Sequence, residues 1–336
     1  MRNDQPTTPQ SARPEKSKWL LWARLAFFLC LIAGTVWVLR RQNQPYQSNE
    51  GSVFGTTYHI SYQSPTDFHP EIVRILQQVD EALSLFNEKS WLSRYNAGQN
   101  PCKNAMASEV ISLAMRISKE TQGAFDITVA PLVNAWGFGV KHGNPPSNAQ
   151  LDSLKALVGY QRYLKGERVM LDCGAIAKGY GVDCVARLLR RHGVKNFMVE
   201  IGGEVVVSGK NREGSPWRIG VARPSEASGQ MESILPLTDA AMATSGNYRN
   251  FHTDSLGRRY AHTIDPRLGR PVQQTLLSAT VIAPTCAEAD AWATACMVMG
   301  HESAVKLMKA HPTLKYFFIY DKQGRMATDC SPELKP

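Results

Sequence analysis

The sequence lacks the patterns that mark three classes of protein. Its seven cysteines form no CxxC pair and no Cys/His cluster with the spacing of a zinc site. It has no run of lysines and arginines with interleaved aromatic residues, the pattern typical of nucleic-acid-binding surfaces, and no internal repeat. A cysteine-ligated zinc protein, a protein with DNA or RNA as its partner and a repeat protein are therefore disfavoured. The cysteines are expected to be mainly buried, with room for one disulfide.

Positive charge is concentrated near the N-terminus. The formal net charge is +9 over 336 residues, and residues 1–50 hold seven lysines and arginines against three acids, which leaves +5 for the rest. So small a surplus on the body favours anionic small molecules at most as its partners. The length allows one large domain or two modest ones, well above the size at which a core is hard to bury.

A long apolar run follows a polar N-terminus. Residues 1–18 are polar, basic and proline-rich, which predicts a disordered tail. Residues 19–39 are apolar except for Arg24, whose side chain can snorkel, so the run is able to span a bilayer. Five lysines and arginines precede the uninterrupted apolar run and two follow it directly, which places the N-terminus in the cytoplasm and the body outside. We predict an uncleaved signal anchor; a cleaved signal peptide is the alternative, and a buried core helix is least favoured.

Beyond a polar linker at 40–51, the pattern predicts one domain at 52–330. Mainly antiparallel strands with helices packed on them make this an α+β fold, with room for two lobes that meet at a ligand cleft. The strands that follow residue 204 are predicted to form an antiparallel meander. Alternation predicts strands at 52–63, 205–208, 217–221, 235–237, 241–244, 277–283 and 316–320, and helical spacing predicts helices at 72–86, 108–121, 148–158 and 285–299.

The rest of the domain is organised around residues 171–204. This stretch reads as a strand end that carries Asp172, a turn at Gly174, a helix with Lys178 in its first turn, and a second strand that ends at a Gly-Gly pair. Because a helix N-terminus offers unpaired N–H groups and partial positive charge, this start can bind a phosphate or a metal–phosphate ligand. The alternative is that these residues only cap and pack the helix.

The helix at 285–299 carries a second candidate site. Thr285 is a good N-cap, with Glu288 at the capping-box position. Asp290 and Thr294 are four residues apart, so a carboxylate and a hydroxyl project from one face. Two hard oxygen ligands suit Mg²⁺, which shares its shell with water and substrate phosphates. The alternative is an ordinary acid near the helix start and a threonine bonded to its own helix.

Asp126 is a single acid among apolar neighbours. It is flanked by Phe125 and Ile127, and a buried acid needs a partner. Either Asp126 binds a ligand, or it caps a helix that begins near Val129 while the aromatic residues belong to the core.

His262 and Asp265 lie three residues apart in a turn-rich segment. Pro266 holds Asp265 out of helical geometry, and neither residue fits a core periodicity. His262 is a candidate general base because its ordinary pKa lies near working pH. The alternative is that His262 merely braces the turn formed by Asp265 and Pro266.

Five sequence blocks, in order and together spanning most of residues 52–322, resemble the ApbE family of FAD:protein FMN transferases. They are FGTTYHISY at 54–62, GAFDITVAPLVNAWGFG at 123–139, LDCGAIAKGYGVD with VEIGGE within 171–204, HTIDPRLGRPV at 262–272 and SATVIAPTCAEADAWATA at 278–295. The resemblance implies an ApbE-like, T-fold-like architecture. It also implies a Mg²⁺-dependent enzyme that moves FMN from FAD onto a Ser or Thr hydroxyl of an acceptor protein and releases AMP.

The resemblance also implies the site residues. The metal would be held by Asp290, Thr294 and the main-chain carbonyl of Ala175. Contacts to FAD would come from Phe54, Phe86, Ala124, Phe125, Asp126, Asp172, Lys178 and Ile264. Lys178 would supply a second positive charge and His262 would accept the acceptor's proton, while Phe54 and Phe125 would line the flavin and adenine. Two positions depart from the family's pattern: Phe86 stands where many relatives have Tyr, and Ala293 where some have a third acid.

Family members work outside the cytoplasmic membrane, which agrees with the predicted anchor. The resemblance thus implies a single-pass protein of the bacterial inner membrane with a periplasmic catalytic domain. The expected acceptors are flavin-carrying subunits of membrane redox complexes. Two alternatives remain open: hydrolysis of FAD to FMN and AMP, and a flavin-binding protein without turnover.

Overall fold

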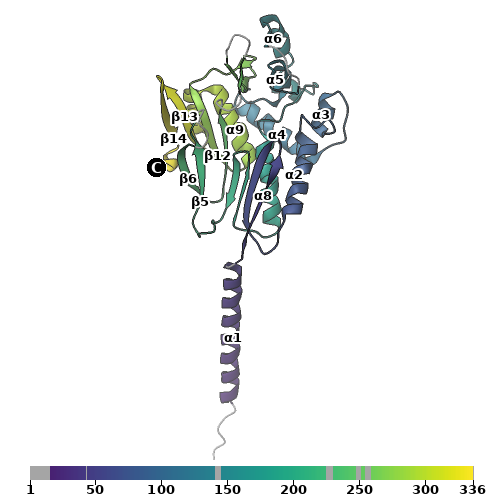
Figure 1. The fold of residues 1–336 in the computed structure, drawn as a ribbon. Helices are drawn as coiled ribbons and strands as arrows, with labels where there is room; N and C mark the ends of the chain where they lie inside the picture. The colour runs from purple at the N-terminus through teal and green to yellow at the C-terminus, as the bar shows by residue number, and fades with distance from the viewer. Residues whose placement is uncertain are drawn as a thin grey trace, which may run out of the picture. The chain divides into compact units, whose positions relative to one another are not determined.

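The computed structural model describes residues 16–42, 44–140, 145–224, 230–246, 251–253 and 259–335 (Figure 1). The chain divides into two compact units, residues 1–45 and residues 46–336. All seven cysteines lie in the described residues, and none of them forms a disulfide; Cys173, Cys184, Cys286 and Cys296 are buried.

The first unit contains one long helix, α1 (Lys16–Gln42). Within it, Trp19–Val36 is long and apolar enough to cross a membrane, and none of this window is buried inside the protein. A membrane anchor and a signal sequence both have these properties. Of the predicted tail, residues 1–15 lie outside the described residues and residues 16–18 belong to α1.

An eight-stranded antiparallel sheet forms the centre of the second unit, as the α+β prediction required (Figure 1). The strand order is β1-β2-β3-β4-β7-β12-β13-β14. Residues 46–51, predicted as linker, instead belong to edge strand β1, and β14 was not predicted. The strands are β1 (Tyr46–Val53), β2 (Thr56–Gln63), β3 (Phe197–Ile201), β4 (Glu204–Ser208), β7 (Ala240–Gly246), β12 (Leu276–Ala283), β13 (Lys315–Lys322) and β14 (Arg325–Cys330).

Helices cover one face of this sheet (Figure 1). They bury apolar stripes, such as Ile72, Leu76 and Val79 of α2, against the inward residues of β2, β7 and β12. The core helices are α2 (His69–Leu83), α4 (Ala105–Glu120), α8 (Ala177–Arg191) and α9 (Cys286–Met299). Helix α10 (His301–Ala310) follows α9 in the sequence. The predicted helices at 72–86, 108–121 and 285–299 are confirmed with shifts of a few residues, and Thr285 is the N-cap of α9, as predicted.

A separate hairpin of β5 (Trp217–Ala222) and β6 (Met231–Leu237) packs on the opposite face. Its residues Trp217, Ile219 and Leu235 share a core cluster with Val207 and Ile319 of the main sheet. The predicted meander is therefore wrong in its pairing, because β4 pairs with β7 and the intervening hairpin leaves the sheet. Because the hairpin is not part of the main sheet, it can cover the face of that sheet that would otherwise contact solvent.

Short elements complete the chain. The predicted weak helix at 148–158 is α6, which the capping box of Ser147 and Gln150 begins. The short elements are α3 (Trp91–Asn96), η1 (Ile127–Val129), α5 (Ala130–Ala135), α6 (Asn148–Lys155), α7 (Tyr160–Leu164), β8 (Phe251–Thr253), β9 (Arg259–Ala261), β10 (Ile264–Asp265), β11 (Arg270–Pro271) and η2 (Pro332–Leu334).

Two tight turns bring strand ends next to α8. The β1–β2 turn has φ of 53° at Phe54 and 75° at Gly55, and the β3–β4 turn has positive φ at Gly202 and Gly203. A bulky residue with positive φ is strained, so Phe54 must be held in place by its surroundings. Its ring lies against Gly181 of α8, where an added Cβ would come within 2.7 Å of the ring.

Helices α8 and α9 pack backbone to backbone where they cross. A Cβ on Gly179 would lie 2.3 Å from the carbonyl oxygen of Cys286, so only glycine fits there. Asp183 of α8 caps α9, because its two carboxylate oxygens accept the N–H groups of Cys286 and Ala287, both at 2.9 Å. The first turn of α9 is thereby fixed to α8.

The Asp183→Asn variant tests this cap through its pH dependence. Burial raises the pKa of Asp183 to about 6, although the two N–H groups oppose the shift. The folded state therefore binds the proton more tightly than the unfolded state, so Asp183 adds stability as pH falls from about 6 towards 4. We expect the wild type to gain stability relative to Asp183→Asn between pH 7.5 and pH 4.5, as measured by urea unfolding of the full chain in detergent. Asp152→Asn, which changes an exposed acid, is the control. A stability difference that is equal at both pH values would contradict the assignment.

Candidate active site

The blocks at 123–139 and 262–272 lie side by side. The indole N–H of Trp136 donates to the carbonyl of Gly269 at 2.9 Å, and Ile264 is buried in one cluster with Leu132 and Trp136. Ala124, which is also buried, packs with Val272. Two segments more than a hundred residues apart therefore pack together and form one wall of the candidate site.

The segment that carries Asp172 joins this wall. The N–H of Asp172 donates to the carbonyl of Ile127 at 2.6 Å, and its Oδ1 accepts the N–H of Gly174 at 2.7 Å. No strand is present before Gly174, so the predicted strand end is wrong: Leu171 is held instead by a pair of hydrogen bonds to the side chain of Asn96. Burial raises the pKa of Asp172, and the bond from Gly174 opposes the shift.

Asp126 caps a helix, as its alternative interpretation predicted. Its Oδ1 accepts the N–H and the hydroxyl of Thr128, both at 2.8 Å, and its Oδ2 accepts the N–H of Tyr160 at 2.7 Å. The helix is the short η1, two residues earlier than predicted. Burial raises the pKa of Asp126 despite these three donors. The carboxylate thus ties η1 to α7 next to Asp172.

Three charged side chains meet where α8, α9 and β4 come together. The Nζ of Lys178 lies 2.5 Å from Oε1 of Glu204, and Asp290 accepts the N–H of Gly179 on its Oδ2 at 3.1 Å. The side chains of Glu204 and Asp290 are almost fully buried. Burial disfavours the charged form of Lys178, but the carboxylates of Asp290 and Glu204 outweigh it and raise the pKa of Lys178, which stays an ammonium ion. Burial raises the pKa of Glu204, and Lys178 opposes this shift.

Glu204 was not singled out as a site residue in the sequence. Its only signal is a lone acid directly after a glycine pair at the start of a strand. That signal says nothing about a partner 26 residues earlier in the chain. The pairing with Lys178 depends on the β3–β4 turn delivering Glu204 to the N-terminal end of α8.

The predicted metal ligands have the chemistry of a hard-cation site. No three His, Cys, Asp or Glu side chains within the described ranges are grouped as metal ligands. Asp290, the Thr294 hydroxyl and the Ala175 carbonyl would be one carboxylate and two neutral oxygens, a set that suits Mg²⁺ completed by water and phosphate. Among the residues described, no N–H donates to the Ala175 carbonyl, because the N–H of Gly179 turns to Asp290 instead. The residues therefore fit the metal.

Thr294 does not bond back to its own helix in the way its alternative interpretation required. Its hydroxyl lies 3.2 Å from the hydroxyl of Ser245 on β7. Ala293, where some relatives have an acid, is fully buried in the apolar core. An acid at this position would have to be accommodated among apolar side chains, so the neutral residue suits the packing.

The other predicted residues have different surroundings. Phe125 is buried in the core beside the Asp126 cap. Phe86 is 76% exposed just beyond the end of α2, and His262 is half-buried directly before β10. Arg267 also contacts the turn at Asp265, because it donates to the Asp265 carboxylate through its backbone N–H, Nε and Nη2.

A cavity of about 300 Å³ lies at the N-terminus of α9 rather than at this cluster. None of the predicted site residues, all of which are described, lines it. The charged groups around it are engaged: Glu109 accepts from Tyr180 and Arg187, and Asp183 caps α9. These charged residues of the cavity lining therefore already have partners within the protein.

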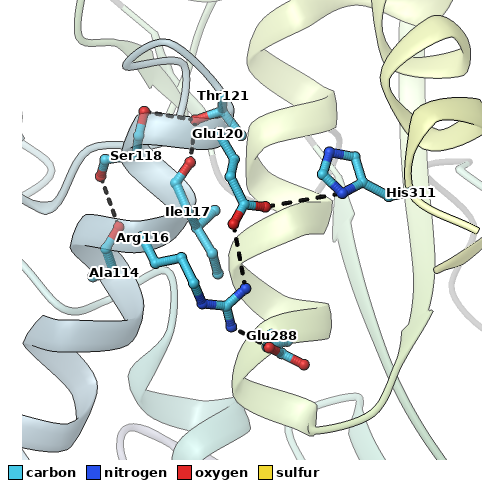
Figure 2. Close-up of polar contacts among 8 residues, drawn as sticks. All are labelled: Ala114, Arg116, Ile117, Ser118, Glu120, Thr121, Glu288 and His311. Atoms are coloured by element: carbon cyan, nitrogen blue, oxygen red, sulfur yellow. Dashed lines mark hydrogen bonds and ion pairs between the residues drawn. The ribbon is translucent and has the colours of Figure 1, made fainter. Parts of the chain in front are cut away.

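A polar link joins α4 to α9 at Glu288, which is one of the residues that line that cavity (Figure 2). Arg116 lies between Glu120 of its own helix and Glu288 of α9, and Glu120 also faces His311. Arg116 is half exposed, so the link is worth on the order of 1 kcal/mol at most.

The structure defines an α+β protein in which a partly exposed lysine and two buried carboxylates form a candidate active site next to a set of hard oxygen donors. The family model described as "ApbE family" matches residues 54–318, so the chain belongs to the ApbE family. It is 38% identical over 280 residues to the FAD:protein FMN transferase of Vibrio cholerae serotype O1, covering 78% of this chain and 84% of that relative. It is 34% identical over 309 residues to the Escherichia coli K12 protein of the same name, covering 85% of this chain and 87% of that protein.

Solved structures agree with this assignment. The flavin transferase ApbE from Vibrio cholerae superposes with a TM-score of 0.77 at 35% identity, covering 86% of this chain and 98% of that one. The apo form of the Pseudomonas stutzeri flavinyl transferase ApbE gives a TM-score of 0.76 at 32% identity, covering 86% and 96%. The expected family and architecture are confirmed.

Proposed function

We propose that the protein is an FAD:protein FMN transferase, which moves the FMN part of FAD onto a Ser or Thr hydroxyl of an acceptor protein, requires Mg²⁺ and releases AMP. The observation that carries the proposal is the cluster of Lys178 with the buried carboxylates of Glu204 and Asp290, where two of the five blocks meet. It stands in a chain 38% identical to a relative named for this reaction. A partly exposed cation next to a hard-oxygen donor set suits a diphosphate substrate.

The residues divide into two groups. Asp290, Thr294 and the carbonyl of Ala175 would hold Mg²⁺, which supplies neutralising charge for the diphosphate when it is bound. The wall that carries Ala124–Asp126 and Ile264, with Asp172 beside it, would contact FAD. Phe54 and Phe86 would contribute aromatic contacts to FAD at the edges of this wall.

In the proposed step, the acceptor's hydroxyl oxygen bonds to the FMN-side phosphorus of FAD. The bond from that phosphorus to the bridging oxygen breaks, and AMP leaves with the electron pair. His262 takes the hydroxyl proton, and Lys178 places its positive charge against the diphosphate oxygens. Because such a transfer requires little covalent chemistry from the protein, alignment and charge account for most of the rate.

We also propose that α1 is an uncleaved, single-pass anchor in the bacterial inner membrane, with residues 52–330 as a periplasmic catalytic domain. The apolar window Trp19–Val36 and the excess of positive residues before it support this orientation. A flavin-carrying subunit of a membrane redox complex on the same side would be the acceptor.

The test is to incubate the full chain in detergent with FAD, Mg²⁺ and a candidate acceptor. We expect one FMN to be added to each acceptor, measured by mass spectrometry, with one AMP released. Equal release of FMN and AMP without acceptor would favour hydrolysis. Stoichiometric retention of FAD with no AMP over a long incubation would contradict the proposal.

A further inference from the structure

Glu204 is a buried carboxylate at the start of β4. Its side chain is only 3% exposed, because the β3–β4 turn places it under the N-terminal end of α8. Buried carboxylates are rare in proteins unless a partner compensates their charge. The ammonium group of Lys178 is the cation that compensates this carboxylate.

The two oxygens of Glu204 have different surroundings. Oε1 lies 2.5 Å from the Nζ of Lys178, whereas Oε2 is buried and has no hydrogen-bond partner in the described part of the chain. A carboxylate can accept several hydrogen bonds, but the only side chain in the described ranges that is bonded to the Glu204 carboxylate is Lys178. A buried carboxylate oxygen without a hydrogen bond destabilises the folded state, so we infer that Glu204 has a role other than stabilising the fold.

Two carboxylates, those of Glu204 and Asp290, act on the charge of Lys178. Asp290 acts on Lys178 electrostatically, and the neighbouring Gly179 bonds to Asp290 directly. Within the described ranges, the only ion pair of Lys178 is the one with Glu204. Without Glu204, the ammonium would have Asp290 as its remaining nearby carboxylate, and an Asp290 paired with Lys178 is a poorer ligand for a cation.

We propose that Glu204 is a positioning residue that holds the Lys178 ammonium away from Asp290 and so keeps the Asp290 carboxylate open for the metal. The inference rests on the proposed function, because it takes Asp290 as a Mg²⁺ ligand. It goes further in assigning to Glu204 control of metal affinity through Lys178 and not through direct coordination.

The experiment measures Mg²⁺ binding to the full chain in detergent by isothermal titration calorimetry, without FAD or acceptor. We expect Glu204→Gln to weaken binding about 10-fold or more, the usual effect of removing a residue that orients a metal ligand. We expect Lys178→Met to bind at least as tightly as the wild type, because a competing cation is gone. Adding Glu204→Gln to Lys178→Met should then change affinity by less than about 3-fold, since the effect operates through Lys178.

The double variant decides the mechanism. If Glu204→Gln weakens binding equally with and without Lys178, Glu204 acts directly on the metal and the inference is wrong. Unchanged affinity of both Glu204→Gln proteins also overturns it, while leaving the metal site intact. A wild-type protein that binds no Mg²⁺ would overturn the metal site of the proposed function as well.

The comparison of Lys178→Met with the double variant remains valid even where Glu204→Gln alone fails to fold. Glu200→Gln is the matched control, because it removes a carboxylate of β3 that accepts the N–H of Gly203 in the same turn and pairs with the half-exposed His59. We expect it to leave Mg²⁺ affinity within about 3-fold of the wild type.

Discussion

Asp290→Asn is expected to lower the rate of FMN transfer by at least about 100-fold, because it removes the only charged ligand of the proposed metal site. The substitution keeps the shape of the side chain, and an amide oxygen can still accept the N–H of Gly179. The variant should therefore fold, with a melting temperature within a few degrees of the wild type. The rate is measured as FMN added to the acceptor per unit time at saturating FAD and Mg²⁺.

The control for Asp290 is Glu288→Gln on the same helix. Glu288 lies two residues earlier and faces Arg116, so its loss changes the helix charge without touching the cluster. We expect its transfer rate to stay within about 3-fold of the wild type. An Asp290→Asn protein that labels the acceptor as fast as the wild type would show that the metal is held elsewhere.

Gly179→Ala is expected to destabilise the protein by about 1–3 kcal/mol or more, although the same change inside a helix normally stabilises it by about 1 kcal/mol. The new Cβ would lie 2.3 Å from the Cys286 carbonyl oxygen, and backbone atoms cannot rotate away. The helices α8 and α9 would have to separate, which would also move Asp290. We expect a lower urea midpoint and weaker Mg²⁺ binding.

Gly181→Ala is the matched control for Gly179→Ala. Its Cβ would meet side-chain atoms of Phe54 and not backbone atoms, so we expect a smaller loss of stability. A Gly179→Ala protein as stable as the wild type would contradict the close helix crossing.

Elements with strong periodicity could be predicted from the sequence. Helices α2, α4 and α9 and strand β12 were found because apolar spacing along a segment reports directly on which face is buried. The cap at Thr285 was found for a similar reason, since a hydroxyl before an apolar run followed by Glu288 is a local signal.

Errors arose where structure depends on partners far away in the chain. Edge strand β1 looked like a polar linker because half of it faces solvent and its apolar alternation is weak. The β5–β6 hairpin was placed in the main sheet because alternation identifies a strand without identifying its neighbour. Asp172 was placed on a strand, whereas it lies on an extended segment held by Asn96 and Ile127.

The sequence by itself determined the family, the apolar N-terminal helix and the residues available for chemistry, because these depend on residue identity and local spacing. Only the tertiary structure decided how those residues are paired. Lys178, Glu204 and Asp290 come from α8, β4 and α9, and their contacts exist because a glycine turn and a glycine helix crossing allow three backbones to approach closely. Burial then makes each charge depend on its neighbour, which no local pattern can specify.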